Sequence, residues 1–173
     1  LSGYLPPITT QDFRLESGVP GRGAFSASEA KSAGEARKYA DFLELPYGIE
    51  AYFDYDQARR AALREGKPLL IDFTGHGCVN CREMESRVWS DSRVLSIMKQ
   101  DYVVCALYAD DKMVLPREDW VTTPEGKVLK SLGKINSWFA MTRFNVNAQP
   151  YYAILDPATE KHKVPSRGYD LDV

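Results

Sequence analysis

Apolar runs alternate with amphipathic stretches over the second two-thirds of the chain. The runs 69–74, 102–108 and 151–155 are short and almost continuously apolar, which predicts buried strands of the kind found where helices cover both faces of a sheet. From about residue 78 onward, apolar side chains recur at spacings of three, four and seven, as on a helix, and 136–144 can form a further helix. Strands that alternate with helices predict an α/β layer fold.

Capping and breaking residues mark the ends of the predicted helices. Asp54 or Asp56 can cap a short helix that runs through Glu65, and Gly66 supplies its stop. We expect the pair Ser90-Asp91 to interrupt or recap the helix that begins near residue 78. These signals are local, so they place helix ends without any knowledge of the fold.

Two further segments have weaker patterns. Residues 110–135 are polar and are broken by prolines and glycines, which predicts a loop or irregular structure. The stretch 162–164 is a candidate edge strand, paired to 151–155 across a turn at Asp156-Pro157.

The first 47 residues differ in composition from the rest. They are rich in Gly, Ser, Ala and Pro, and one helix over 28–43, capped by Ser28, would present mostly alanine and bury little area. We therefore predict a tether over 1–47, partly ordered at most, and one domain over 48–173. The chain opens on Leu1 with neither an initiator Met nor a signal-peptide pattern, which predicts a piece of a larger protein.

Composition and charge exclude several classes of protein. The 22 basic and 24 acidic side chains give a net charge of −2, so there is no basic excess to bind nucleic acid. With 44% hydrophobic residues the chain can bury a core, which excludes a disordered polyanion. The longest apolar run, 102–109, is too short to span a bilayer. Three cysteines are too few for a disulfide-stapled mini-protein, and their odd number leaves one unpaired.

The pair Cys78-x-x-Cys81 carries the candidate chemistry. On the first turn of a helix that follows a strand, the two sulfurs come within disulfide reach, and the N–H groups of the helix start lower the pKa of the outer thiol. Cys78 would attack a partner disulfide and Cys81 would resolve the mixed disulfide. Half of a zinc site is an alternative, although neither Cys105 nor His162 offers ligand spacing. A structural disulfide is another, although so short a loop stabilises little.

Several motifs together resemble a known family. They are Gly66-Lys67-Pro68, Ile71-Asp72-Phe73, Cys78-Val79-Asn80-Cys81, the stretch 89–94 and Gln149-Pro150. This set resembles the thioredoxin superfamily and, over about residues 50–170, is most similar to the C-terminal periplasmic thioredoxin-like domains of DsbD thiol:disulfide interchange proteins. The resemblance implies a thioredoxin-like α/β fold with a central mixed sheet flanked by helices. It also implies an inserted loop around 110–135 and a C-terminal helix that would begin where the sequence ends.

The resemblance also implies roles for individual residues. Pro150 matches the cis-proline that faces the active site and leaves the backbone at Gln149 free to pair with a partner chain; the alternative is an ordinary trans turn. Asp72 matches a buried acid whose pKa is raised by desolvation and which exchanges a proton with Cys81; it could otherwise be a satisfied polar residue. Glu85 matches a second acid that opposes thiolate formation, unless it is a solvated helix residue.

The sequence departs from thioredoxins around the cysteines. Gly77 stands where a Trp is usual, which predicts a more open and less apolar partner groove, and Val79-Asn80 lacks the usual Pro. His76, if charged, could favour the Cys78 thiolate; it could equally be an ordinary surface residue. The predicted partner groove therefore consists of six residues: His76, Gly77, Val79, Asn80, Gln149 and Pro150. Cys105 lies inside a predicted strand, where we expect a buried and inert thiol.

The resemblance implies a thiol–disulfide oxidoreductase that acts as an electron-relay reductase domain. Its Cys78–Cys81 pair would receive electrons from a membrane-embedded cysteine pair and pass them to an N-terminal periplasmic domain of the same protein, and onward to disulfide isomerases and cytochrome c maturation proteins. It would be a periplasmic domain of an inner-membrane protein and would use no metal or organic cofactor besides its redox-active disulfide. A free-standing disulfide oxidase or isomerase, and a non-catalytic adaptor that binds a partner through the loop around Trp120, are the alternatives.

Overall fold

The computed structural model describes residues 35–171, in which a compact unit begins at Arg37. Its main sheet has the order β1-β3-β2-β6. Strands β1 and β2 run parallel to β3, and β6 runs antiparallel to β2, so the sheet is mixed, as expected. The strands are β1 (Ala51–Tyr52), β2 (Leu69–Thr74), β3 (Val103–Tyr108) and β6 (Tyr151–Leu155).

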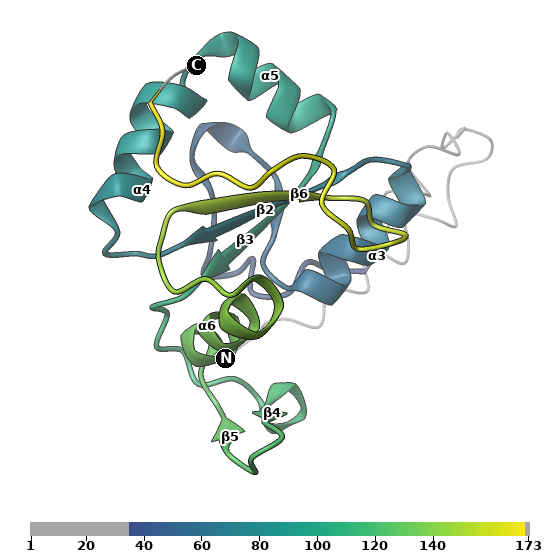
Figure 1. Ribbon diagram of the computed structural model, residues 1–173, viewed down its shortest axis with the longest axis vertical. Coiled ribbons are helices and arrows are strands. Elements are labelled where there is room, and N and C mark those ends of the chain that lie inside the picture. The colour runs from purple at the N-terminus through teal and green to yellow at the C-terminus, as the bar shows by residue number, and fades with distance from the viewer. Residues whose placement is uncertain (1–34, 172–173) are drawn as a thin grey trace, which may run out of the picture. The chain divides into compact units, whose positions relative to one another are not determined.

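Helices cover both faces of this sheet (Figure 1). On one face lie α3 (Tyr55–Glu65) and α6 (Leu132–Phe144), and on the other lie α4 (Val79–Met84), a π-helical turn (Glu85–Trp89) and α5 (Ser92–Gln100). The predicted ends of α3 are confirmed: the Asp54 carboxylate accepts the N–H of Gln57 at 3.0 Å, and Gly66 ends the helix with φ +67°. Asp91 caps α5, which confirms the predicted recapping.

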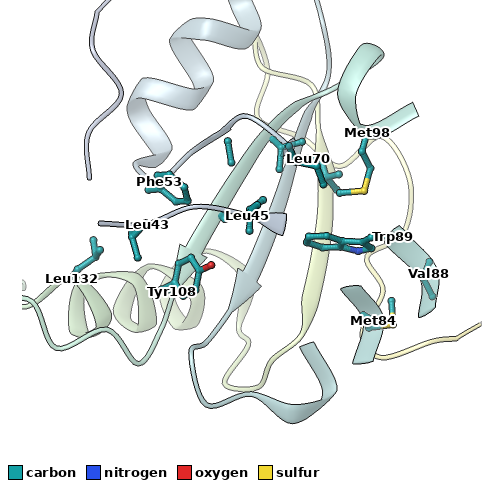
Figure 2. Close-up of a cluster of buried hydrophobic side chains, with 14 of the residues drawn as sticks. Leu43, Leu45, Phe53, Leu70, Met84, Val88, Trp89, Met98, Tyr108 and Leu132 are labelled. Carbon is teal, nitrogen blue, oxygen red and sulfur yellow. The ribbon is translucent and has the colours of Figure 1, made fainter. Parts of the chain in front are cut away.

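Alternate residues of β2 and β3 face opposite cores, because side chains along a strand point to opposite sides. Leu69, Ile71 and Phe73 pack with residues of α3 and α6. Leu70 packs on the other side, with Trp89, Met98 and their neighbours (Figure 2). Asp72 and Thr74 share the parity of Leu70 and therefore point to the side of α4 and α5.

The compact unit begins earlier than predicted. Leu43 and Leu45 are only 3% and 4% exposed and lie in the same hydrophobic core as Trp89 (Figure 2). Within the described residues, the predicted helix over 28–43 is absent: Tyr39 has φ +65° and 38–42 form turns. Residues 37–47 are therefore part of the domain and not of a tether, because two leucines two positions apart place one side of an extended segment in the core.

The predicted irregular region is shorter than expected and partly ordered. Helix α6 begins at Leu132, one turn before the predicted start at 136. Before it lie a 3-10 turn (Arg117–Asp119) and a hairpin of β4 (Val121–Thr122) and β5 (Val128–Leu129). Gly133 does not break the helix, because it lies in the first turn, where its N–H donates outside the helix, to the Asp111 carbonyl at 2.8 Å. A Cβ at this position would lie 2.5 Å from that oxygen.

The segment after β6 passes along the outer edge of the sheet to α4 (Figure 1). The predicted strand at 162–164 is reduced to a single bridge, between Leu155 and His162, and a second bridge joins Tyr152 to Arg167. Further on, the Tyr169 hydroxyl donates to Glu83 of α4 at 2.7 Å. None of the helices within residues 35–171 has both the length and the apolar character that crossing a bilayer requires.

Candidate active site

Cys78 and Cys81 form a disulfide at the start of α4, with their Cα atoms 5.2 Å apart. Cys78 is the N-cap residue, and the backbone N–H of Cys81 donates to its sulfur at 3.1 Å. Cys78 is half-buried, whereas Cys81 is only 2% exposed. Cys78 is therefore the more accessible of the two cysteines.

An acid in the turn after β3 holds the loop that leads to Cys78. Both carboxylate oxygens of Asp110 accept backbone N–H groups of this loop, from His76 at 2.7 Å and from Gly77 at 2.9 Å. The carboxylate lies so close that a Cβ at Gly75 would be 3.1 Å from it. Burial opposes ionisation of Asp110, but the two backbone hydrogen bonds outweigh it, and its pKa is lowered from the ordinary value.

The ring of His76 points to a second acid of the same segment. Its Nε2 lies 2.7 Å from Oδ2 of Asp111, and the ring stacks on Tyr108 with centroids 4.5 Å apart. Asp111 also accepts the N–H of Met113 at 2.8 Å. The sequence analysis missed both acids. The available signal was their position just after β3, because β3 runs parallel to β2 and parallel strands end at the same edge of a sheet.

Asp72 is buried on the side of the sheet that α4 covers. It is 2% exposed, and within residues 35–171 neither of its carboxyl oxygens has a hydrogen-bond partner. Burial first, and then the negative charge of Glu85, raise its pKa to about 8, against the opposing effect of Arg82. The structure therefore places an acid that is mostly protonated at neutral pH on the side of the sheet that carries α4, beside the charges of Glu85 and Arg82.

Glu85 is buried and not solvated. Its Oε1 accepts from Nη2 of Arg82 at 2.9 Å, and the same nitrogen donates to Oγ1 of Thr74 at 3.1 Å. Burial raises the pKa of Glu85, and the guanidinium of Arg82 counteracts this. The sequence analysis missed Arg82; its position directly after Cys81 and three residues before Glu85 was the available signal.

Aromatic side chains complete the surroundings of Asp72. Tyr152 lies opposite it in the register of β2 and β6, and its ring meets that of Trp89 edge-on, with centroids 6.2 Å apart. Burial first, and then the charges of Asp72 and Glu85, raise the pKa of the Tyr152 phenol. The carboxyl of Asp72 therefore has little access to water, which is the reason for its raised pKa.

The predicted groove residues gather at the same end of the sheet. The Gln149–Pro150 peptide is cis, and because Tyr151 pairs with Phe73, Pro150 lies where β2 ends and the loop to Cys78 begins. Val79, between the cysteines, is 77% exposed. His76, Gly77 and Asn80 are exposed as well, and Gln149 is half-buried.

The third cysteine lies apart from this site. Cys105 is buried in the core between the sheet and the helices α3 and α6, as expected, and burial raises the pKa of its thiol. Within residues 35–171, no three His, Cys, Asp or Glu side chains gather in a way that could hold a metal ion.

Comparison with known proteins assigns the family. Residues 49–157 match a family model described as thioredoxin-like. The chain belongs to this thioredoxin-like family. Over 73 residues, the domain is 34% identical to the thiol:disulfide interchange protein DsbD of Ralstonia nicotianae; the match covers 40% of this chain but only 12% of that protein. These matches confirm the superfamily and the likeness to DsbD.

One solved structure has a similar fold with a TM-score above 0.5. A structure named DsbH oxidoreductase superposes with a TM-score of 0.51 at 16% identity and covers 82% of this chain and 87% of its own. The oxidised C-terminal domain of Neisseria meningitidis DsbD is also similar, with a TM-score of 0.45, 16% identity, and coverage of 70% and 89%. Identities this low concern the fold alone.

Proposed function

We propose that this domain is a thiol–disulfide oxidoreductase that works as a reductive electron relay. The observation that carries the proposal is the disulfide between a half-buried Cys78 and a buried Cys81 at the start of α4, on the side of the sheet to which the buried Asp72 points. The likeness to DsbD supports the reductive direction. On the same likeness we propose a periplasmic location, within an inner-membrane protein.

In the first step, the reduced pair attacks a partner. The Cys78 thiolate bonds to one sulfur of the partner disulfide, and the other partner sulfur leaves as a thiolate and takes a proton from solvent. The Cys81 N–H, which donates to the Cys78 sulfur in the oxidised domain, is placed to stabilise that thiolate. The product is a mixed disulfide between Cys78 and the partner.

In the second step, Cys81 releases the partner. Its thiol loses a proton and its sulfur attacks that of Cys78, which expels the second partner sulfur as a thiolate. This thiolate also takes a proton from solvent, so the partner leaves with two electrons and two protons more than it brought. A carboxyl with a pKa of about 8 both takes and returns protons near neutral pH. The ionised form of Asp72, which is the minor form at pH 7 and the major form above pH 8, is therefore suited to accept the proton of Cys81 and to return it when the pair is reduced again.

An upstream dithiol restores the reduced pair by the same exchange in reverse. We propose that this donor is a membrane-embedded cysteine pair, and that the acceptor is an N-terminal periplasmic domain of the same DsbD-like protein, with disulfide isomerases and cytochrome c maturation proteins further on. Sulfur chemistry alone balances both steps, so the proposal includes no metal and no organic cofactor.

The reduction potential tests the direction of the relay. The domain is equilibrated with glutathione buffers of known potential, and its thiols are counted by mass after alkylation. A midpoint more negative than about −220 mV, near the upper end of the cytosolic glutathione range, supports the reductant. A more positive midpoint refutes it and favours a disulfide oxidase.

Cysteine variants test the mechanism. With a disulfide-bonded peptide as the partner, Cys81→Ser should accumulate a mixed disulfide at Cys78, and Cys78→Ser should form none. Cys105→Ala is the matched control and should react like the unaltered domain, because Cys105 is buried elsewhere. If Cys78→Ser still reduced the peptide, the exchange mechanism would be wrong.

A further inference from the structure

The loop between β2 and Cys78 is held by two acids in the segment that follows β3. The Asp110 carboxylate accepts hydrogen bonds from the backbone N–H groups of His76 and Gly77, and the Asp111 carboxylate contacts Nε2 of the His76 ring. None of these contacts is local in the sequence, since Asp110 follows His76 by 34 positions. The contacts therefore exist only in the folded domain.

This pair of acids has a rigid base. The carbonyl of Asp111 accepts the N–H of Gly133 at 2.8 Å, and the first turn of α6 packs so closely that a Cβ at Gly133 would be 2.7 Å from the Asp111 nitrogen and 2.9 Å from the Ala109 oxygen. Interiors packed this closely do not deform smoothly. Asp110 and Asp111 are thus fixed to the body of the domain, and the loop is fixed to them.

The hydrogen bonds to Asp110 also concern the nucleophile. The N–H groups of the two residues before Cys78 both donate to the Asp110 carboxylate. That carboxylate is ionised at neutral pH, because its pKa is below the ordinary value. Its negative charge contacts the backbone of Gly77, the residue before Cys78, and a like charge near a thiol disfavours the thiolate.

Other charged groups lie around the cysteine pair and also affect how readily Cys78 forms a thiolate. His76 is part of the loop itself, Arg82 lies on α4, and the acids Asp72 and Glu85 are buried behind them. Arg82 is engaged by Glu85 and Thr74, and the Nε2 atom of His76 by Asp111. Asp110 is the exposed acid that directly contacts the loop backbone.

We propose that Asp110 and Asp111 form a clamp that positions Cys78 and restrains its conversion to the thiolate. This inference rests on the proposed exchange at Cys78 and names the residues that regulate it. When a partner docks and brings a positive charge to Asp110, or pulls the loop away from Asp110, it removes the restraint on thiolate formation at Cys78. Asp110 and Asp111 are positioning residues, because they act through the loop and not on the reacting sulfur.

The test is the ionisation of Cys78 in Asp110→Asn. The reduced domain is alkylated with iodoacetamide across a pH series, and the site is mapped by peptide mass. An amide keeps one acceptor oxygen but loses the charge and the second acceptor. We expect the midpoint to move to lower pH and the rate at pH 7 to rise about two- to fivefold, as for the loss of a partly exposed like charge. The His76 and Gly77 amides should also exchange hydrogen faster.

Asp156→Asn is the matched control. Asp156 accepts the backbone N–H groups of Ala158 and Thr159, at 2.8 and 3.4 Å, in a turn at the opposite end of β6. It has the same chemistry at a distance from Cys78, so alkylation should not change. Asp111→Asn, which leaves the two hydrogen bonds of Asp110 in place, should shift the midpoint in the same direction as Asp110→Asn, but less.

An alkylation midpoint that stays or rises in both Asp110→Asn and Asp111→Asn would overturn the proposal. Faster amide exchange without a lower midpoint would also overturn it, because the clamp would then be structural only. Alkylation needs no partner protein. A shifted midpoint in a domain that fails to reduce disulfides would therefore refute the relay while leaving the clamp in place.

Discussion

The buried carboxyl of Asp72 makes the stability of the domain depend on pH, and the dependence can be calculated. Its pKa is about 8 in the folded domain and 3.8 ordinarily. Between these values the folded state keeps a proton that the unfolded state has lost. The contribution of Asp72 is therefore fully favourable below pH 3.8 and is lost as pH rises, by about 1.4 kcal/mol per pH unit. From pH 4.5 to 7 the loss from this group is about 3 kcal/mol.

Asp72→Asn removes this dependence while nearly preserving the shape of the side chain. The amide has its own burial penalty, but that penalty does not change with pH, so the informative quantity is the change in the difference between the variant and the unaltered domain. The variant should gain about 3 kcal/mol relative to the unaltered domain between pH 4.5 and 7. In urea this is a relative shift of the midpoint by about 1 M or more.

The assay is urea unfolding of the oxidised domain, followed by tryptophan fluorescence at several pH values and constant ionic strength. Asp91→Asn is the control. Hydrogen bonds from the side chain and backbone of Arg93 lower the pKa of Asp91 from 3.8 to about 2, so its contribution is present above pH 3.8 and is lost only as pH falls toward 2. The difference between Asp91→Asn and the unaltered domain should therefore stay constant from pH 4.5 to 7. A difference between Asp72→Asn and the unaltered domain that stays constant from pH 4.5 to 7 would refute the reasoning.

Three further variants probe other contacts. Leu45→Ala should lower the free energy of unfolding by about 2–5 kcal/mol, because this leucine is buried in the core; a change below 0.5 kcal/mol in urea unfolding would return residues 37–47 to the tether. Gly133→Ala should lower it by about 1–3 kcal/mol through overpacking against Asp111, and should speed hydrogen exchange in the loop before Cys78, while an unchanged exchange rate would argue against the rigid base. Arg82→Gln leaves Glu85 buried without its cation and should lower the unfolding free energy at pH 7 by about 1–2 kcal/mol, after allowance for the exposure of Arg82, and by less at pH 4; an equal loss at both pH values would contradict the ion pair.

Local signals predicted most of the domain. The cap at Asp54, the stop at Gly66 and the apolar runs of β2, β3 and β6 are contained within a few residues each, so helix ends and strands followed directly. The burial of Asp72 followed too, because an acid inside an apolar run has no water to face. The resemblance to thioredoxins added the cis peptide before Pro150, which no local pattern requires.

Contacts between distant segments were not predictable in the same way. Leu43 and Leu45 lie in an alanine-rich and proline-containing stretch, and only the core that they fill reveals their role. Asp110 and Asp111 read as ordinary loop acids until β3 lies beside β2 and brings the ends of both strands together. Arg82 reads as a surface residue until Glu85 turns inward beside it.

The order of the segments along the chain has a consequence for how the domain is made. The cysteine pair is synthesised before the proposed clamp, which consists of Asp110 and Asp111 with the α6 turn at Gly133, and before Pro150 and the strand that pairs beside Asp72. In a growing chain that has not yet reached Asp110, Cys78 and Cys81 therefore lack the clamp. They acquire it when β3 pairs with β2 and brings Asp110 to the loop before Cys78.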